Sequence, residues 1–142
     1  MDSALAYSVV AVDQKEIDEI NILKASIVGM QRAVQQLKIH PEFLLIDGNR
    51  FYPFEDYEYE CVIKGDGKFM SIAAASILAK TERDMYMEKI HEEFPHYDWK
   101  KNKGYPTKAH RAAIAKHGSC EHHRHSFQLL PVKQGVLPFP KK

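Results

Sequence analysis

The chain has 142 residues, of which 44% are hydrophobic and 27% are charged, and its formal net charge is +1. These values are typical of one soluble globular domain, and no apolar run reaches the ~20 residues that a membrane-spanning helix needs. The near-neutral charge excludes a global basic surface for nucleic acid, although basic residues cluster locally at 100–103 and 116–124. For the lysine run at 100–103, an ordinary solvated surface explains the charges equally well.

The first forty residues predict a strand followed by a helix. Residues 6–12 are rich in β-branched and aromatic side chains, which favours a strand. Asp13 and Glu16 form the Asp-x-x-Glu pattern of a helix capping box. Apolar residues then recur every three or four positions and predict one buried helix face: Ile20, Leu23, Ile27, Met30, Val34 and Leu37. Pro41 ends this segment.

Two further strands and a long helix follow. Residues 43–47 are apolar up to the final aspartate, which predicts a central strand, and the alternation over 57–63 predicts a half-exposed edge strand. A helix is expected from about Phe69 to Phe94, with small side chains at 73–76 that permit close approach to a sheet. The order of elements indicates an α/β domain.

The last third is expected to be mostly irregular. Residues 95–106 contain two prolines and a glycine and predict a loop. Thr107 is a good N-cap for a helix to about Lys116, and Gly118 suits its C-cap. Residues 119–142 are expected to be irregular. Neither the N-terminus nor Cys61 and Cys120 indicate secretion or a disulfide framework, so we expect a cytoplasmic protein with reduced thiols.

Two aspartates are the first candidates for chemistry. Asp47 ends the apolar strand, and Asp66 follows 19 positions later (66 − 47 = 19) between two glycines. A carboxylate at the end of a buried strand needs a cation, hydrogen-bond donors or water. Magnesium often uses one or two carboxylates together with phosphate oxygens. The alternative is that Asp47 only caps the turn into Gly48.

The glycine-rich stretch around Asp66 is a second candidate. Glycines at 65 and 67 let the backbone approach a ligand, and the following helix N-terminus, with Lys68 beside it, is suited to phosphate. The stretch does not fit the P-loop pattern, and a simple turn before a helix is the alternative. Tyr105, within Gly104-Tyr105-Pro106-Thr107, could offer a flat face to a sugar or base, or could be ordinary loop packing.

A histidine-rich segment closes the set of candidates. Residues 117–125 hold four histidines and one cysteine, residue types that bind zinc, but their spacing fits no common two-plus-two ligand pattern. A polar, basic surface that approaches phosphates is the alternative.

The order of these motifs and the residues in them resemble those of the ribonuclease HII family over nearly the whole chain. The stretches that carry the resemblance are Ala6 to Val9, Glu16 to Leu23, Asp47-Gly48-Asn49-Arg50, Lys64-Gly65-Asp66, Ser71 to Asp84, Gly104 to Thr107, and His123-Arg124-His125-Ser126-Phe127. The part Ile72-Ala73-Ala74-Ala75-Ser76-Ile77-Leu78-Ala79-Lys80 is highly specific.

The resemblance implies an RNase H-like mixed sheet flanked by helices, in a domain over residues 1–130 with an irregular tail at 131–142. It implies an endonuclease that uses Mg²⁺ or Mn²⁺ to hydrolyse the RNA strand of RNA–DNA hybrids. The same activity would cut duplex DNA 5′ of an embedded single ribonucleotide.

Individual roles carry over by motif. Asp47 and Asp66 match the third and fourth acids of the four-acid metal site, as catalytic residues and metal ligands. Tyr105 matches a tyrosine that stacks on a sugar at the RNA–DNA junction. Lys68, Arg124 and Ser126 are expected to contact substrate, and a structural role is expected for Asp84.

One family motif, Asp-Glu-x-Gly-Arg-Gly, occurs nowhere in the chain. It would supply two acids and the backbone that senses the 2′-hydroxyl, the group that distinguishes RNA from DNA. We therefore expect an N-terminally truncated domain with very little activity and with uncovered strand edges and apolar surface.

Two other classes of protein stay open at this stage. The first is a catalytically inactive nucleic-acid-binding remnant that keeps Tyr105, Lys68 and the His/Arg segment. The second is a small zinc-binding interaction domain built on residues 117–125. The sequence does not indicate the oligomeric state.

Overall fold

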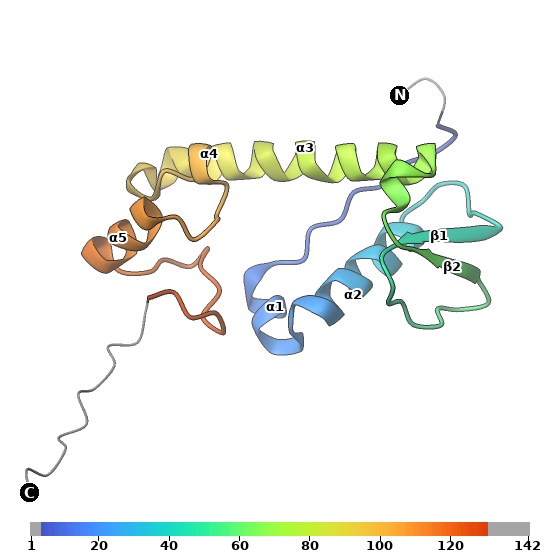
Figure 1. The fold of residues 1–142 in the computed structure, drawn as a ribbon, viewed down its shortest axis with the longest axis horizontal. Coiled ribbons are helices and arrows are strands. Elements are labelled where there is room, and N and C mark those ends of the chain that lie inside the picture. The colour runs from blue at the N-terminus through green and yellow to red at the C-terminus, as the bar shows by residue number, and fades with distance from the viewer. Residues whose placement is uncertain (1–3, 131–142) are drawn as a thin grey trace, which may run out of the picture.

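The computed structural model describes residues 4–130, and the expected tail at 131–142 lies outside the described residues. Figure 1 shows a long helix, α3 (Met70–Glu93), with the remaining elements hanging along one side of it. Strands β1 and β2 lie near its N-terminal end, helices α4 and α5 lie near its C-terminal end, and helix α1 lies between them, with α2 running from α1 toward the sheet. The α/β class expected from the order of elements is confirmed.

The sheet in the described region consists of β1 (Phe43–Asp47) and β2 (Glu58–Val62), which pair in parallel. Asp47 is opposite Val62 in the register, so both strands point their carboxyl ends at the turn that holds Asp66. The prediction that β1 is central is wrong for the described residues, because β1 pairs only with β2 there. The prediction of a half-exposed β2 is confirmed by its alternating burial.

The predicted strand at 6–12 is wrong. The residues are not paired with any strand within 4–130, and a β-rich sequence cannot form a ladder without a partner. They run along α2 (Ile22–Gln35) instead: Ser8 Oγ donates to Gln36 Oε1 at 3.3 Å, and Gly29 makes room for Val12.

The predicted long helix after Asp13 is interrupted. It divides into α1 (Gln14–Ile20) and α2 at Asn21, whose backbone has φ 69° and ψ 163°. The Asn21 side chain accepts hydrogen bonds from the amides of Leu23 and Lys24 and so caps α2. The capping role of Asp13 is confirmed, since its carboxylate accepts the amide of Glu16 at 2.8 Å. The Glu16 side chain pairs with Arg32 of α2 at 2.7 Å and braces the bend.

The predicted loop at 95–106 is more ordered than expected. It contains a 3-10 turn (Pro95–Tyr97) and the short helix α4 (Trp99–Asn102) before α5 (Lys108–His117). Burial of two aromatic rings explains the order, because Tyr97 and Trp99 are each only 2% exposed. Thr107 caps α5 through the amide of His110, and Gly118 ends it, both as predicted.

The hydrophobic core has two parts. One joins α2 to the sheet through Ile27, Leu44, Ile46 and Phe51. The other packs the end of α3 against the C-terminal elements through Met87, Ile90, Tyr97, Trp99 and Ile114. Between them, no residue of 73–86 is buried, and Ile77 is 64% exposed. The expected uncovered apolar surface is therefore present along α3 and at the open edges of the described strands.

Asn21 offers a direct test of the bend. We expect Asn21→Ala to lower the free energy of unfolding by about 1–2 kcal/mol, because it removes the cap of α2 and keeps a β-carbon at a positive φ. Asn21→Gly should cost only a few tenths of a kcal/mol, since glycine tolerates this backbone. Urea unfolding followed by circular dichroism measures both. Equal losses for the two variants would show that the backbone conformation at Asn21 is unimportant.

Candidate active site

Asp47 is held in place by the turn that follows β2. Its Oδ1 accepts the amide of Gly65 at 2.9 Å, which leaves its other carboxylate oxygen available. A β-carbon at Gly65 would lie 2.5 Å from Ile72 Cδ1 and 3.3 Å from Asp47 Oδ1. Any other residue at 65 would therefore force the Ile72 side chain to move away from the gap between the aspartate and the first turn of α3. The predicted alternative, a cap on the turn into Gly48, is not what the structure shows: the Gly48 amide donates to the Val62 carbonyl at 2.9 Å, and Asp47 accepts from Gly65 instead.

Asp66 lies next to Gly65 in the 3-10 turn Gly65–Gly67, so the structure brings the turns that carry the two predicted acids together. Both aspartates are solvent-exposed and open to a ligand. Lys68 is exposed directly before α3, and no side chain caps that helix. The unpaired amides and positive end of α3 thus lie beside the acids, an arrangement suited to phosphate.

Tyr105 sits on a loop whose backbone is firmly hydrogen-bonded while its side chain is 70% exposed. Its amide donates to the Asn102 carbonyl at 2.8 Å, and its carbonyl accepts from the Thr107 amide at 2.8 Å and from His110 Nδ1 at 3.0 Å. Asn102 also accepts the Gly104 amide through its side chain. An exposed ring on a fixed backbone is what stacking on a sugar or base requires.

Two arginines accompany this loop. Arg83 of α3 donates to the Lys103 carbonyl at 3.1 Å and lies 3.5 Å from the β-carbon position of Gly104. Arg124 stacks its guanidinium on Phe127, with Cζ 3.9 Å from the ring centroid. Burial, and after it the charge of Arg83, lowers the pKa of Arg124. Like charges held near one another are suited to a polyanion such as a phosphate backbone.

The side chain of Ser126, which is predicted to contact substrate, is hydrogen-bonded to Asp18 in this structure. Its hydroxyl and amide both donate to Asp18 Oδ1, and the His125 amide donates to Asp18 Oδ2 at 2.6 Å. The hydrogen bond from the Ser126 hydroxyl lowers the pKa of the Asp18 carboxyl. Burial raises this pKa, but the hydrogen bonds from the two amides lower it further, and it stays below its ordinary value. Asp18 of α1 thus clamps the turn next to Arg124. Asp84, for which a structural role is expected, has its Oδ1 atom 3.9 Å from Lys103 Nζ.

Two buried histidines connect these parts, and their tautomers follow from their partners. Trp99 Nε1 can only donate, so His110 Nε2 is an acceptor and its Nδ1 carries the proton given to Tyr105. His123 Nδ1 accepts the Cys120 amide at 3.1 Å, so its Nε2 donates to His110 Nε2 at 3.3 Å. Burial, and next the neighbouring His110, lowers the pKa of His123 to about 4.

The zinc hypothesis for residues 117–125 is wrong for this structure. His117 lies beside His96, with ring centroids 4.5 Å apart, His122 faces Tyr86, and His123 is buried against His110, so the rings have different partners. Within residues 4–130, no three His, Cys, Asp or Glu side chains gather as a metal site. Cys61 and Cys120 are free thiols, as expected.

The acids and the Tyr105 loop lie on the same side of α3 but at different positions along the helix axis. Ile72 contacts the acid-bearing turn, and Arg83 contacts the Tyr105 loop. They are 11 positions apart (83 − 72 = 11), which at about 100° per residue returns the helix to nearly the same face and gives a rise of about 17 Å. The candidate site is therefore elongated, with its two parts spaced along one helix (Figure 1).

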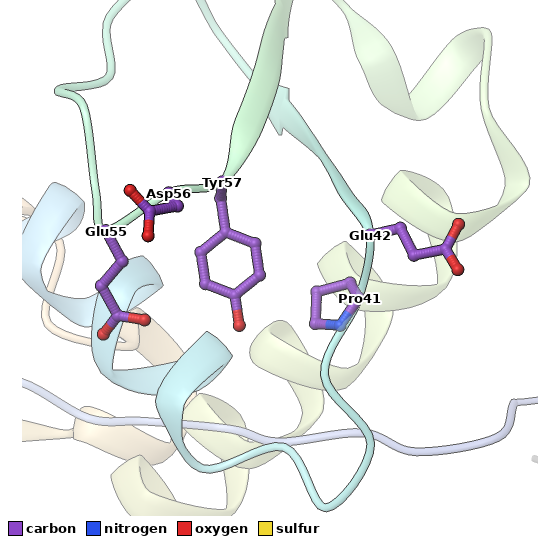
Figure 2. Close-up of a pocket in the computed structure, with 5 residues that line it drawn as sticks. All are labelled: Pro41, Glu42, Glu55, Asp56 and Tyr57. Carbon is purple, nitrogen blue, oxygen red and sulfur yellow. The ribbon is translucent and has the colours of Figure 1, made fainter.

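A pocket at the opposite end of the strands is not part of this site. It is lined by Pro41, Glu42, Glu55, Asp56 and Tyr57 and lies where β1 and β2 begin. Figure 2 shows the Glu42 side chain pointing away from Glu55 and Asp56, so the acidic groups do not converge. In parallel sheets, ligands bind outside the carboxyl ends of strands, where Asp47 lies.

Sequence reasoning missed Arg83, Asp18 and His110. Nothing local distinguishes Arg83 and Asp18 from other charged helix residues, because their partners are 20 and 107 or more positions away. His110 could have been found: it lies four positions before Ile114, on the buried face of α5.

Comparison with known proteins defines the class first. The fold is similar to a crystal structure of ribonuclease H2 from Pyrococcus horikoshii OT3, with a TM-score of 0.74 over 90% of this chain and 68% of that one; at 22% identity this shows the fold alone. The protein is therefore an α/β domain of the ribonuclease H2 fold.

The family follows from the sequence comparisons. The model of the ribonuclease HII family matches residues 1–130. The chain is 66% identical to a ribonuclease HII of Christiangramia forsetii over 92% of its length and 66% of the relative's. It is 64% identical to a ribonuclease HII of Bacteroides thetaiotaomicron over 96% of its length and 68% of the relative's. The chain belongs to the ribonuclease HII family, and it spans about two thirds of the length of these relatives.

The low pKa of His123 predicts acid sensitivity. Unfolded histidine binds a proton near pH 6.5, whereas the folded ring resists protonation down to about pH 4. This contribution to stability is therefore fully present above pH 6.5 and is lost as the pH falls toward 4. Urea unfolding at several pH values should give a flatter pH dependence for His123→Asn than for the unmodified chain. The exposed His125→Gln is the control and should keep the steep dependence; identical slopes for all three would contradict the assignment.

Proposed function

We propose that this chain carries part of the active site of a ribonuclease HII type endonuclease, acting on RNA–DNA hybrids and on duplex DNA with an embedded ribonucleotide. Family membership over residues 1–130 supports the class of enzyme. The observation that carries the proposal is the pairing of the Asp47 and Asp66 turns with an exposed Tyr105 and two arginines on one side of α3.

In this proposal Asp47 and Asp66 hold Mg²⁺ or Mn²⁺. The donor set fits hard divalent cations, because both groups are exposed carboxylates and Asp47 keeps one oxygen free of hydrogen bonds to residues 4–130. When bound, such an ion would make water nucleophilic and stabilise charge on the scissile phosphate. Gly65 fixes the Asp47 rotamer through its amide, and Lys68 with the α3 N-terminus attracts the phosphate.

The second part of the site binds the duplex. Tyr105 would stack against a sugar, and Arg124 and Arg83 would contact phosphates. At about 3.4 Å per base pair, the rise of about 17 Å between the two parts corresponds to roughly five base pairs. A duplex lying along α3 would therefore meet both parts, and Ser126 would serve by holding the Arg124 turn to Asp18.

Activity of this chain by itself is proposed to be low. The motif Asp-Glu-x-Gly-Arg-Gly is absent from the 142 residues, and no third carboxylate joins Asp47 and Asp66 within residues 4–130. Two acids can bind a metal, but they fix its position less firmly than four.

Cleavage of a labelled duplex with one ribonucleotide tests this proposal. With Mg²⁺ or Mn²⁺, we expect the chain to cut at least about a hundredfold more slowly than a fusion carrying the Asp-Glu-x-Gly-Arg-Gly segment ahead of residue 1, since metal stabilisation is worth several kcal/mol. Asp47→Asn or Asp66→Asn should abolish cleavage by the fusion. Asp56→Asn, in the pocket at the other end of the strands, is the matched control and should leave it unchanged. Equal rates for chain and fusion would contradict the expected impairment, and unaffected cleavage by the two site variants would contradict their role.

A second candidate function is nucleic-acid binding without cleavage. It is favoured by the second part of the site, where Tyr105, Arg83 and Arg124 are in place regardless of the acids. The cleavage experiment separates the two functions.

Salt dependence of binding tests the arginines under either function. We expect Arg124→Gln and Arg83→Gln each to reduce the slope of log affinity against log salt by about 1, because each removes one phosphate contact. Fluorescence anisotropy with a labelled duplex gives these slopes. Lys38→Gln, an exposed cation beyond the end of α2, is the control and should keep the original slope. Unchanged slopes for both arginine variants would remove them from the interface.

A further inference from the structure

The buried polar side chains of this chain are concentrated behind the duplex-binding part of the site. The buried polar residues in the described chain are Asn102, His110 and His123. Asn102 donates to the Tyr97 carbonyl at 2.6 Å and accepts the Gly104 amide at 2.9 Å. His110 donates to the Tyr105 carbonyl, and His123 holds the turn that leads to Arg124. Burying a polar group costs free energy unless the group is hydrogen-bonded. A hydrogen-bonded network of buried polar groups therefore fixes the conformation of the segments that it joins.

The direction of the hydrogen bonds makes this network rigid. Trp99 donates to His110 Nε2, and His110 Nδ1 donates to the Tyr105 carbonyl. His123 Nε2 also donates to His110 Nε2. Trp99 Nε1 at 3.2 Å and His123 Nε2 at 3.3 Å share the single lone pair of His110 Nε2, and the only N–H proton of His110 is used on the Tyr105 carbonyl. Turning His110 over would set a ring C–H against the Trp99 Nε1–H group, and turning His123 over would set one against the Cys120 amide. Each flip would leave a donor without its acceptor, so each ring has one orientation.

We propose that the His110–His123 pair is the positioning device of the duplex-binding site: it sets the Tyr105 loop and the Arg124 turn in a fixed relation to each other. Neither histidine touches the substrate in this account. His110 acts through the Tyr105 carbonyl, and His123 acts through the Cys120–His123 turn next to Arg124. The inference rests on the proposed substrate roles of Tyr105 and Arg124, while the positioning itself stands on the hydrogen bonds.

A matched pair of substitutions separates positioning from general stability. His110→Gln places an amide near the former Nε2 atom, where its oxygen can accept from Trp99 and His123, but it loses the donor to Tyr105. His110→Asn places an amide near the former Nδ1 atom, where it can donate to Tyr105, but it loses the acceptor inside the core. The Gln variant should therefore release the loop, whereas the Asn variant should mainly lower thermal stability.

Two readouts on the full chain test the proposal. Hydrogen exchange at the Thr107 amide, which shares the Tyr105 carbonyl, should become roughly three- to tenfold faster in His110→Gln than in His110→Asn, the range expected for loss of one hydrogen bond. Anisotropy with a duplex carrying one ribonucleotide, without metal, should show a loss of affinity of similar size for His110→Gln. That loss should disappear when Tyr105→Ala is already present, because His110 then has no ring to position.

The outcomes are distinguishable. Unchanged Thr107 exchange in His110→Gln, or equal loss of affinity in the Gln and Asn variants, would overturn the positioning role. If Tyr105→Ala alone leaves the affinity intact, the proposed substrate role of Tyr105 fails, and the exchange experiment still decides whether His110 fixes the loop.

If His110→Gln does not fold, His123→Asn provides the test. It keeps an acceptor for the Cys120 amide but cuts the link to His110, and it should make binding less sensitive to Arg124→Gln. Unchanged sensitivity would overturn the link.

Discussion

Helix α3 is the constraint on which the rest of the structure depends. Its first turn packs on Gly65 through Ile72 and thereby fixes the turn whose Gly65 amide donates a hydrogen bond to Asp47. Arg83 and Met87 contact the Tyr105 loop from the same face of the helix. The two core clusters lie at opposite ends of this helix, and the residues between them are uncovered. Because a helix has a fixed rise and twist, the spacing between the acids and the duplex-binding part is set by sequence separation alone.

The two parts of the site are built by different physical means. The acidic part relies on close backbone approach: a glycine, a tight turn and an uncapped helix end leave the carboxylates exposed and oriented. The binding part relies on polar hydrogen bonds, in which two histidines, an asparagine and the half-buried Asp18 hold the backbone. The Tyr105 ring is exposed, and the half-buried Arg124 lies on Phe127. The first arrangement suits a small cation and phosphate, and the second suits a large polyanion.

Much of this could be predicted from sequence, for reasons that are local. Periodicity and turn chemistry within short windows predict strand β2, the long helix and the caps at Asp13 and Thr107. They also predict that Asp47 ends a strand and that Asp66 lies in a turn. The break at Asn21, the missing strand at 6–12 and the order in 95–102 depend on tertiary partners and were not predictable this way. Ser126 shows the same limit: its hydroxyl bonds to an aspartate 108 positions earlier, which no local pattern encodes.

The central claim is that one duplex contacts both parts of the site along α3. The most direct measurement is the affinity of the chain for a series of hairpin-closed junction duplexes that differ only in length. The account predicts that affinity rises until the duplex reaches roughly five base pairs between the two contacts and then levels off, and that Lys68→Gln weakens only the longer duplexes. Affinity that is already maximal for the shortest duplex, or a Lys68→Gln effect independent of length, would contradict it.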